Sequence, residues 1–409
     1  MQIQKCKENP LSILIVGAGH AAGQAAASLR QEKYEGEITV FGDEPVLPYQ
    51  RPPLSKAYLS GEQEQEKLLL RAATFYEKQN IEVKTSTSVT DINPQNSTIK
   101  IDDREELSFE KLLIATGSRV RKINVSGSEL GNVHYLRTIE DVDRIRSGMA
   151  KDKELVIVGG GYIGLEVAAI ATQAGMKVRV LETEDRVLQR VTTPTMSNYY
   201  TRLHEKRGVR IHTQTRVIGF EGRSAVEKVI CDNEAFDADL VIVGIGIIPN
   251  SELAEKAGIA CENGITVDER CQTSIPRIYA AGDCTNHPNP LLNRRLRLES
   301  VPNAMEQARV CAANMVGKDK TYSSIPWFWS DQYELKLQMV GFSSDGDSEV
   351  IRGDMDANQF SVFHVKENKV MAADSVNSPK DFMICKQLIG KEVDLDKLLD
   401  EGVELKALL

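Results

Sequence analysis

The sequence predicts an α/β protein with two doubly wound parallel sheets and a smaller α+β domain at its C-terminal end. Two glycine-rich segments, ILIVGAGHAAGQAAASLR at 13–30 and LVIVGGGYIGLEVAAI at 155–170, join an apolar β-branched run to a run of helix formers. Each is followed by a strand pattern that ends on an acidic residue and by another that ends on glycine. From about Ile325 short alternating segments take over, and these favour an antiparallel sheet.

The glycines of each segment have the spacing of a strand-turn-helix that binds a pyrophosphate. In the first segment Gly17 permits the tight turn, Gly19 lets the backbone approach the phosphates, and Ala22 lets helix and strand pack closely. The phosphates would lie against free N–H groups at the helix N-terminus. The second segment repeats the pattern with Gly159, Gly161 and Gly164. One such segment alone is also compatible with an ordinary strand-turn-helix, but a pair predicts two dinucleotides.

An acidic residue follows the next strand in each copy, where a ribose hydroxyl is bound. It is Asp43 after EITVFG and Glu182 after KVRVL. A carboxylate accepts a hydrogen bond from the ribose 2′-hydroxyl and repels a 2′-phosphate, so Glu182 favours NADH over NADPH. Arg179 and Arg186 are close in sequence and weaken that inference. A protein holding two dinucleotides is expected to move electrons between them.

The bulk composition excludes several classes of function. The chain has 409 residues, enough for two to three domains, and a net charge of −9 without a dense basic tract, which argues against nucleic acid. No apolar run is long enough to span a membrane, and the start, MQIQKCKENP, lacks the apolar stretch of a secretory signal, so we expect a cytoplasmic protein. The seven cysteines are scattered without a C-x-x-C pair, so neither a metal site nor a disulfide framework is predicted.

Two later strands that close on glycine suggest where the domains meet. KLLIATGSR ends at Ala115, Thr116 and Gly117, and DLVIVGIGIIPN ends around Gly244 and Gly246. We interpret Gly117 and Gly246 as crossings between domains. The predicted boundaries are 1–117 with 247–325 for a discontinuous first domain, 118–246 for an inserted domain, and 326–409 for a C-terminal domain with a helix near 378–389.

Several motifs together resemble a known family. The two glycine segments, the ATG turn, LPYQRPPLSK, AAGDC and ESVPNAMEQAR are similar to those of the FAD-dependent ferredoxin–NAD(+) reductases of oxygenase systems, within the pyridine nucleotide-disulfide reductase superfamily. The resemblance covers nearly the whole chain. It implies two Rossmann-like domains, the first binding FAD and the second NAD(H), followed by a C-terminal domain.

The glycine motifs and this resemblance together indicate the cofactor-binding residues. For FAD they are Gly17, Gly19, His20, Ala21, Ala22, Asp43, Arg51, Lys56, Val89, Ala115, Thr116, Gly117, Arg137, Gly282, Asp283, Ser300 and Val301. For NAD(H) they are Gly159, Gly161, Tyr162, Ile163, Gly164, Glu166, Glu182, Gly244 and Gly246.

The resemblance also assigns chemical roles. It places Lys56 beside the flavin N5 and pairs it with Glu166, although a solvated loop lysine and an acid favoured by the helix dipole are the simpler readings. Tyr162 either shields the flavin face or packs between domains. Asp283 either binds FAD hydroxyls or caps the next helix. Val301 precedes Pro302, which suits the first position of a helix, and the N-terminal N–H groups of that helix are expected to stabilise charge on the reduced flavin.

Two features predict how a protein partner docks. By the resemblance, Trp329, with Trp327 two residues before it, lies on the flavin side that ferredoxin approaches; core packing is the alternative. Arg294, Arg295 and Arg297 form a basic cluster in an acidic chain, which would either steer an acidic ferredoxin or form an ordinary solvated face.

Cysteine placement narrows the function. No cysteine lies between Cys6 and Cys231, so no thiol is positioned to take electrons as in the related disulfide reductases, and Cys284 is expected to be a small buried residue. The resemblance therefore implies a ferredoxin–NAD(+) reductase that takes hydride from NADH and passes electrons singly to a [2Fe–2S] ferredoxin serving a cytochrome P450 or ring-hydroxylating oxygenase. The alternatives are an NADH oxidase, an NADH-dependent reductase of a small acceptor, and a redox-regulated binding protein resembling apoptosis-inducing factor. The sequence leaves open a monomer or a weak dimer.

Overall fold

The computed structural model describes residues 12–409, so Cys6 and the N-terminal segment lie outside the described residues. The chain groups into two compact units. The first unit comprises residues up to Gln50, Glu66–Arg119 and Ile248–Ser324, and the second comprises Arg51–Gln65, Val120–Ile247 and Ile325–Leu409. Arg51–Gln65, which carries Lys56, thus belongs with the second unit, although the predicted first domain included it. The three-domain boundaries remain a prediction.

The first unit is built on a five-stranded parallel sheet of order β19-β7-β1-β2-β3. The central strand β1 reads SILIV and is buried at all five positions, as expected for a parallel strand covered on both faces. The strands are β1 Ser12–Val16, β2 Glu37–Phe41, β3 Ile81–Lys84, β7 Lys111–Ile114 and β19 Ile278–Ala280.

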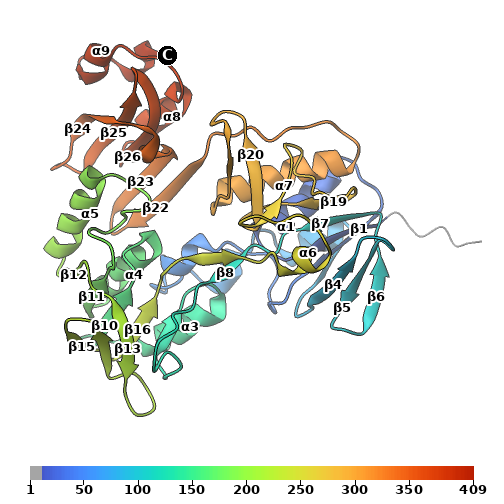
Figure 1. Cartoon of the computed structure of the whole chain (residues 1–409), viewed down its shortest axis with the longest axis horizontal. Helices are drawn as coiled ribbons and strands as arrows, with labels where there is room; N and C mark the ends of the chain where they lie inside the picture. Colours follow the sequence, from blue (N-terminus) through green and yellow to red (C-terminus); the bar gives the residue numbers. More distant parts are fainter. Residues whose placement is uncertain (1–11) are drawn as a thin grey trace, which may run out of the picture. The chain divides into compact units, whose positions relative to one another are not determined.

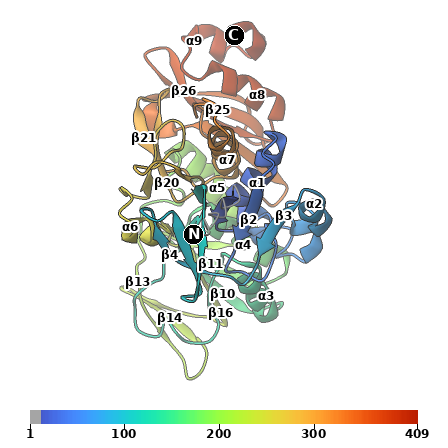
Figure 2. The ribbon, with the colours of Figure 1, turned by 90° about the vertical axis from the view of Figure 1, so that its right-hand side faces the viewer.

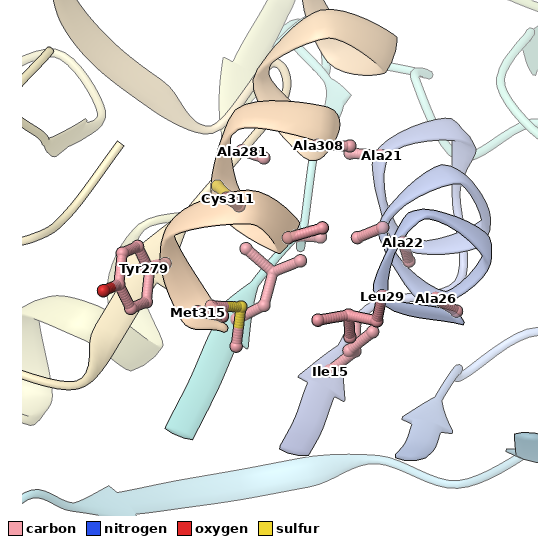
Figure 3. Packing of buried hydrophobic residues seen from close by; sticks show 14 of the residues in the cluster. Ile15, Ala21, Ala22, Ala26, Leu29, Tyr279, Ala281, Ala308, Cys311 and Met315 are labelled. Carbon is pink, nitrogen blue, oxygen red and sulfur yellow. The ribbon is translucent and has the colours of Figure 1, made fainter. Parts of the chain in front are cut away.

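Helices α1 (His20–Gln31) and α7 (Val301–Met315) pack together on one face of this sheet. Their facing positions are mostly alanine, which lets the two helix backbones approach closely; Figure 3 shows Ala21 and Ala308 directed toward one another, with Ile15 of the sheet beneath. Because α1 begins at the glycine turn, this packing fixes the position of that turn.

The opposite face of the sheet is covered by a small antiparallel sheet of order β4-β5-β6 and by α6. The remaining elements of the first unit are β4 Val89–Asn93, β5 Thr98–Ile101, β6 Glu105–Ser108, α2 Ala73–Lys78, α6 Glu252–Lys256, β18 Ile265–Thr266, β20 Thr285–Asn289 and β21 Arg294–Leu296. Strands β8 Ser118–Val120 and β17 Ile247–Pro249 occur where the chain passes from one unit to the other.

The second unit contains a parallel sheet of the same kind, of order β12-β11-β10-β16-β9. Its elements are β9 Val133–Tyr135, α3 Ile139–Gly148, β10 Glu154–Val158, α4 Tyr162–Gln173, β11 Lys177–Leu181, α5 Pro194–Lys206, β12 Arg210–His212 and β16 Leu240–Val243. A three-stranded antiparallel sheet shares a hydrophobic core with one face of it, through strands β13 Val217–Glu221, β14 Lys228–Cys231 and β15 Ala235–Asp237.

The second unit also contains a five-stranded antiparallel sheet of order β22-β23-β26-β25-β24. The strands are β22 Trp327–Gln332, β23 Leu335–Gly341, β24 Ser348–Asp354, β25 Gln359–Lys366 and β26 Lys369–Val376. Helix α8 (Pro379–Leu388) packs on one face against β23 and β26, and the short α9 (Leu395–Leu399) follows (Figures 1 and 2). The predicted fold class is confirmed, including the antiparallel C-terminal sheet.

Candidate functional site

Both glycine turns have a backbone geometry that only glycine accepts easily. Gly17 has φ +106°, and a Cβ there would lie 2.2 Å from the carbonyl oxygen of Ala115. Gly159 has φ +111°, and a Cβ would lie 2.4 Å from the carbonyl oxygen of Gly244. Each turn therefore passes tightly against the residue that follows a neighbouring strand, β7 in the first unit and β16 in the second. The tight turns themselves are as the sequence pattern predicts.

The second glycine of each turn borders open space at the start of a helix. Gly19 is the N-cap of α1 and Gly161 the N-cap of α4; neither helix has a side-chain cap, and a Cβ on either glycine would meet no atom within 4 Å. Free N–H groups beside a backbone without side chains suit a pyrophosphate. The residues of each unit thus fit one dinucleotide.

The third small position serves helix–strand packing. Ala22 is fully buried on α1, and a Cβ on Gly164 would lie 2.3 Å from the carbonyl oxygen of Gly159.

The residues that precede these two positions differ in exposure: Ala21 is buried against the core, whereas Ile163 in the first turn of α4 leaves 45% of its surface exposed. An exposed isoleucine beside the open glycine turn is positioned to cover an apolar part of a ligand.

Glu182 lies beside the second glycine turn. Its carboxylate accepts hydrogen bonds from the Gly160 N–H at 2.7 Å and from the Glu184 N–H at 3.0 Å. These two backbone donors hold the carboxylate at the carboxyl end of the sheet, where the sequence pattern predicts a ribose. In the first unit the exposed Asp43 follows β2, and the neighbouring Glu44 accepts a hydrogen bond from Tyr49 at 2.6 Å.

The two arginines near Glu182 in sequence are engaged elsewhere. The Arg179 guanidinium pairs with Glu154 at the beginning of β10, so it points toward the amino ends of the strands. The Arg186 guanidinium donates to the carbonyl oxygen of Thr192 at 2.9 Å and to that of Gln189 at 3.2 Å. Neither is turned toward a 2′-phosphate beside Glu182.

Lys56 and Glu166 form an ion pair within the second unit. The Lys56 Nζ lies 2.6 Å from Glu166 Oε2, which also accepts a hydrogen bond from Ser55 at 2.5 Å. Ser330 donates to the other carboxylate oxygen at 2.6 Å. Glu166 is only 3% exposed, and a buried carboxylate needs hydrogen-bond donors to offset its charge. Lys56, Ser55 and Ser330 are these donors. The pairing of Lys56 with Glu166 is present as predicted, while its place at the flavin remains a prediction.

Tyr162 packs against the C-terminal sheet. Its ring lies 5.4 Å from that of Phe328 on β22, and its hydroxyl donates to the Met339 sulfur at 2.8 Å. Burial raises the pKa of Tyr162 well above its usual value, so the hydroxyl stays protonated. The packing alternative is therefore observed, and flavin shielding remains untested.

The ATG turn and the residue after it make polar contacts with two other segments of the first unit. The Thr116 hydroxyl donates to the Asn250 carbonyl oxygen at 2.7 Å, and the Ser118 hydroxyl donates to the Asp283 carboxylate at 2.9 Å. Gly282 has φ +89°, which turns the chain at this point. Helix α7 is capped by Ser300, whose hydroxyl accepts from the N–H of Asn303, so the alternative that Asp283 caps this helix is wrong.

The remaining predicted residues occupy varied positions. Arg51 donates to the Arg137 carbonyl oxygen at 2.7 Å. His20 and Val301 begin α1 and α7, Val89 begins β4, and Ala115 and Gly117 follow β7. Gly246 has φ +102° beyond the end of β16.

Cys284 is fully buried, as predicted. Its thiol donates to the Ala281 carbonyl oxygen at 3.4 Å, and burial raises its pKa. A buried thiol with a raised pKa stays protonated and is a poor nucleophile. Every cysteine from residue 12 onward is free of disulfides, and none of the described His, Cys, Asp and Glu residues gather into a group suited to a metal ion.

The two tryptophans and the three arginines predicted for docking are partly engaged within the chain. Trp327 lies 5.7 Å from Trp329 and under the ammonium group of Lys386 at 4.7 Å. Arg295 donates to the carbonyl oxygen of Val267 at 2.8 Å, and Arg297 pairs with Glu299 at 2.6 Å. Arg294 and Arg295 are exposed on β21, whereas Arg297 is half-buried.

Sequence reasoning missed two residues of this site. Ser55 adjoins Lys56 in the RPPLSK segment, which could have suggested it. Ser330 lies 164 positions from Glu166. Nothing in the sequence signals that contact, because it depends on how β22 packs against α4.

Comparisons with known proteins agree with this geometry. Residues 11–308 match the family described as pyridine nucleotide-disulphide oxidoreductase, and residues 327–409 match the reductase C-terminal domain. Over the described range, no helix is both long and apolar enough to cross a membrane.

Similar proteins cover nearly the whole chain. Putidaredoxin reductase CamA of Pseudomonas putida is 45% identical over 407 residues, covering 97% of this chain and 96% of the relative. Rhodocoxin reductase of Rhodococcus erythropolis is 40% identical over 400 residues, covering 97% and 94%. The reductase in a covalent putidaredoxin reductase–putidaredoxin complex has a TM-score of 0.94 at 45% identity, covering 97% of each chain. A ferredoxin reductase for the CYP199A2 system from Rhodopseudomonas palustris also has a TM-score of 0.94, at 38% identity, covering 97% and 100%.

Proposed function

We propose that this chain, which belongs to the pyridine nucleotide-disulphide oxidoreductase family, passes electrons from NADH through FAD to a ferredoxin that serves an oxygenase. The enzyme class and the two cofactors, FAD and NAD(H), follow from the family. The observation that carries the proposal is the pair of open glycine turns, one in each unit, each fitted to one dinucleotide.

When bound, FAD supplies two-electron acceptance from NADH and one-electron donation to an iron–sulfur protein. The protein binds and orients the two nucleotides. The open turn at Gly19 would hold the FAD pyrophosphate, and the turn at Gly161 would hold that of NADH. Lys56, Thr116, Asp283 and the N-terminus of α7 are our remaining candidates for contacts to FAD.

Glu182 supports the choice of NADH over NADPH. Its carboxylate is held in place by two backbone donors, and Arg179 and Arg186 are bound to other acceptors. A 2′-phosphate would therefore meet a fixed negative charge, and neither Arg179 nor Arg186 is directed to balance it.

The Lys56–Glu166 pair supports a charge-compensating role at the redox centre. Ser55 and Ser330 keep Glu166 in place, and Glu166 in turn orients the Lys56 ammonium. A fixed cation stabilises negative charge that arrives with a hydride, without any rearrangement at the moment of reaction.

Two observations support an external protein as the electron acceptor. Cys271, Cys284 and Cys311 are all buried, and burial raises the pKa of the Cys284 and Cys311 thiols, so these two thiols stay protonated and are poor electron relays. The similar proteins named above are reductases of putidaredoxin, rhodocoxin and a ferredoxin. As separate candidates for docking we favour Trp329 in the second unit and the exposed Arg294 and Arg295 in the first, and we assign Arg297 a structural role because it pairs with Glu299.

Anaerobic stopped-flow mixing tests the proposal. Purified protein should carry FAD, NADH should bleach the flavin absorbance rapidly, and a second mix with a [2Fe–2S] ferredoxin should restore it within the same time range. Rapid reoxidation by oxygen together with no reaction with ferredoxins would instead indicate an oxidase. Slow reduction with a long-lived complex and a change in oligomeric state would indicate a redox-regulated binding protein. Either result would overturn the proposal.

A further inference from the structure

A continuous network of hydrogen bonds leads from Glu166 along strand β22 to His204 on helix α5. Ser330 donates to Glu166 Oε1 at 2.6 Å, and Gln332 Nε2 donates to the Ser330 hydroxyl at 3.2 Å. Gln332 Oε1 lies 2.8 Å from His204 Nε2. His204 Nδ1 lies 3.1 Å from the Tyr333 hydroxyl. All five residues belong to the second unit.

The polarity of this network is fixed by the groups at its centre. The Gln332 amide N–H₂ faces Ser330, so its carbonyl oxygen faces His204, and His204 must carry its proton on Nε2. His204 Nδ1 then accepts from Tyr333. Every donor in the network is therefore directed toward Glu166.

This network of hydrogen bonds is buried, and its histidine, His204, is neutral. Ser330, Gln332 and His204 are each 0% exposed. Burial lowers the pKa of His204 to about 4, despite the hydrogen bond that His204 donates to Gln332 and that opposes this shift, so the ring stays neutral near pH 7. In a low-dielectric interior the hydrogen bonds of a complete network are stronger than in water, and leaving any one of its polar groups unpaired lowers the stability of the fold.

The strand geometry explains how the C-terminal sheet reaches Glu166. Residues of β22 alternate between its two faces, so Phe328, Ser330 and Gln332 share one face. Phe328 contacts Tyr162 at the start of α4, and Ser330 contacts Glu166 one turn later on the same helix. This face of β22 therefore follows the surface of α4.

We propose that Ser330 is a positioning residue for the redox centre, holding the Glu166 carboxylate in the orientation that binds Lys56, with Gln332 and His204 fixing Ser330 in turn. The inference rests on the proposed function, which makes the Lys56–Glu166 pair part of that centre. By this proposal, strand β22 of the C-terminal sheet orients a side chain of helix α4 in the proposed redox centre.

Magnetic resonance of the holoenzyme labelled with ¹⁵N-histidine tests the connection without measuring activity. The polypeptide has six histidines, and the signals that disappear in H204Q are those of His204. We expect His204 to carry its proton on Nε2, and we expect E166Q to change the chemical shifts of the His204 ring nitrogens. When Ser330 is already replaced by alanine, E166Q should leave these chemical shifts unchanged. A shift that persists without the Ser330 hydroxyl, or the absence of any shift in the wild-type background, would overturn the proposal.

Single-turnover kinetics test the positioning role. S330A should lower the limiting rate of flavin reduction by NADH about tenfold, as expected for the loss of one charge-assisted hydrogen bond, with the NADH dissociation constant unchanged. S330T keeps the hydroxyl and should recover most of the rate. The control is S361A, which removes a buried hydroxyl bonded to Ser375 at 2.9 Å in the same sheet, and it should match the wild type.

The outcomes separate this proposal from the proposed function. Reduction by NADH is followed in a single turnover by the loss of flavin absorbance, so no ferredoxin is needed. A protein that shows the S330A defect but does not react with any ferredoxin would support Ser330 and refute the ferredoxin reductase. An S330A variant as fast as the wild type, or an S330T variant as slow as S330A, would refute the role of Ser330.

Discussion

We expect single residues to decide which nucleotide each unit accepts, and Glu182 is the clearest candidate. Its two oxygens are held by backbone N–H groups of the glycine turn and of the following loop, so its charge lies at a fixed point. The arginines that the sequence places nearby are bound to Glu154 and to loop carbonyl oxygens instead. The sequence alone left their direction open, because spacing along a strand does not say which end of it a long side chain reaches.

Replacing the Glu182 carboxylate by an amide should weaken the preference for NADH. E182Q keeps the size and one acceptor oxygen but removes the repulsion of a 2′-phosphate, so the ratio of kcat/KM for NADH over NADPH should fall by about tenfold. The control R179M removes a guanidinium that faces Glu154, and it should leave that ratio unchanged. If R179M changed the ratio as much as E182Q does, Arg179 would have to face the nucleotide.

The two open glycines predict a separation of FAD loading from NADH binding. A methyl group at Gly19 or at Gly161 would enter open space, so neither alanine variant should change the melting temperature of the nucleotide-free protein. G19A should lose FAD on purification, whereas G161A should keep FAD and raise the KM for NADH by roughly tenfold or more, because each methyl occupies the approach to one pyrophosphate. Equal loss of FAD in both variants would contradict the assignment of one nucleotide to each unit.

At the scale of elements, the alanine contact between α1 and α7 holds the first glycine turn in place. Ala22 and Ala308 are both 0% exposed, so these positions have no room for a larger side chain. A308L should destabilise the protein by about 1–3 kcal/mol through overpacking. Urea unfolding measures this, and A73L on the exposed surface of α2 should change the unfolding free energy by less than about 0.5 kcal/mol. A stable A308L variant would show that the two helices separate easily.

The elements that the sequence predicted well are those with strong local patterns. The buried runs SILIV and ELVIV, the glycine turns and the helix after Ser300 all have their own period or capping residue. The Lys56–Glu166 pair was predicted through the family motif. The Ser330 contact and the direction of Arg179 were beyond reach, because both depend on packing between segments far apart in the sequence.

At the scale of the whole molecule, each unit contains a buried histidine that should make folding sensitive to acid. Burial lowers the pKa of His204 in the second unit and of His287 in the first unit to about 4 in each case. Both nitrogens of His287 lack a protein partner, and its ring packs edge-on against Tyr322 at 5.0 Å.

The sign of the effect follows from proton uptake on unfolding. Between about pH 6.5 and pH 4 the unfolded chain protonates these rings while the folded chain does not, so stability rises with pH across this window and is fully present above it. Each histidine should contribute on the order of 3 kcal/mol to the loss between pH 7 and pH 4. Replacing His287 by phenylalanine keeps the ring packing against Tyr322 and removes the titrating group. Urea unfolding of H287F should therefore show a shallower loss of stability than the wild type below pH 6.5, and an identical slope in both proteins would mean that His287 is protonated in the folded state as readily as in the unfolded one.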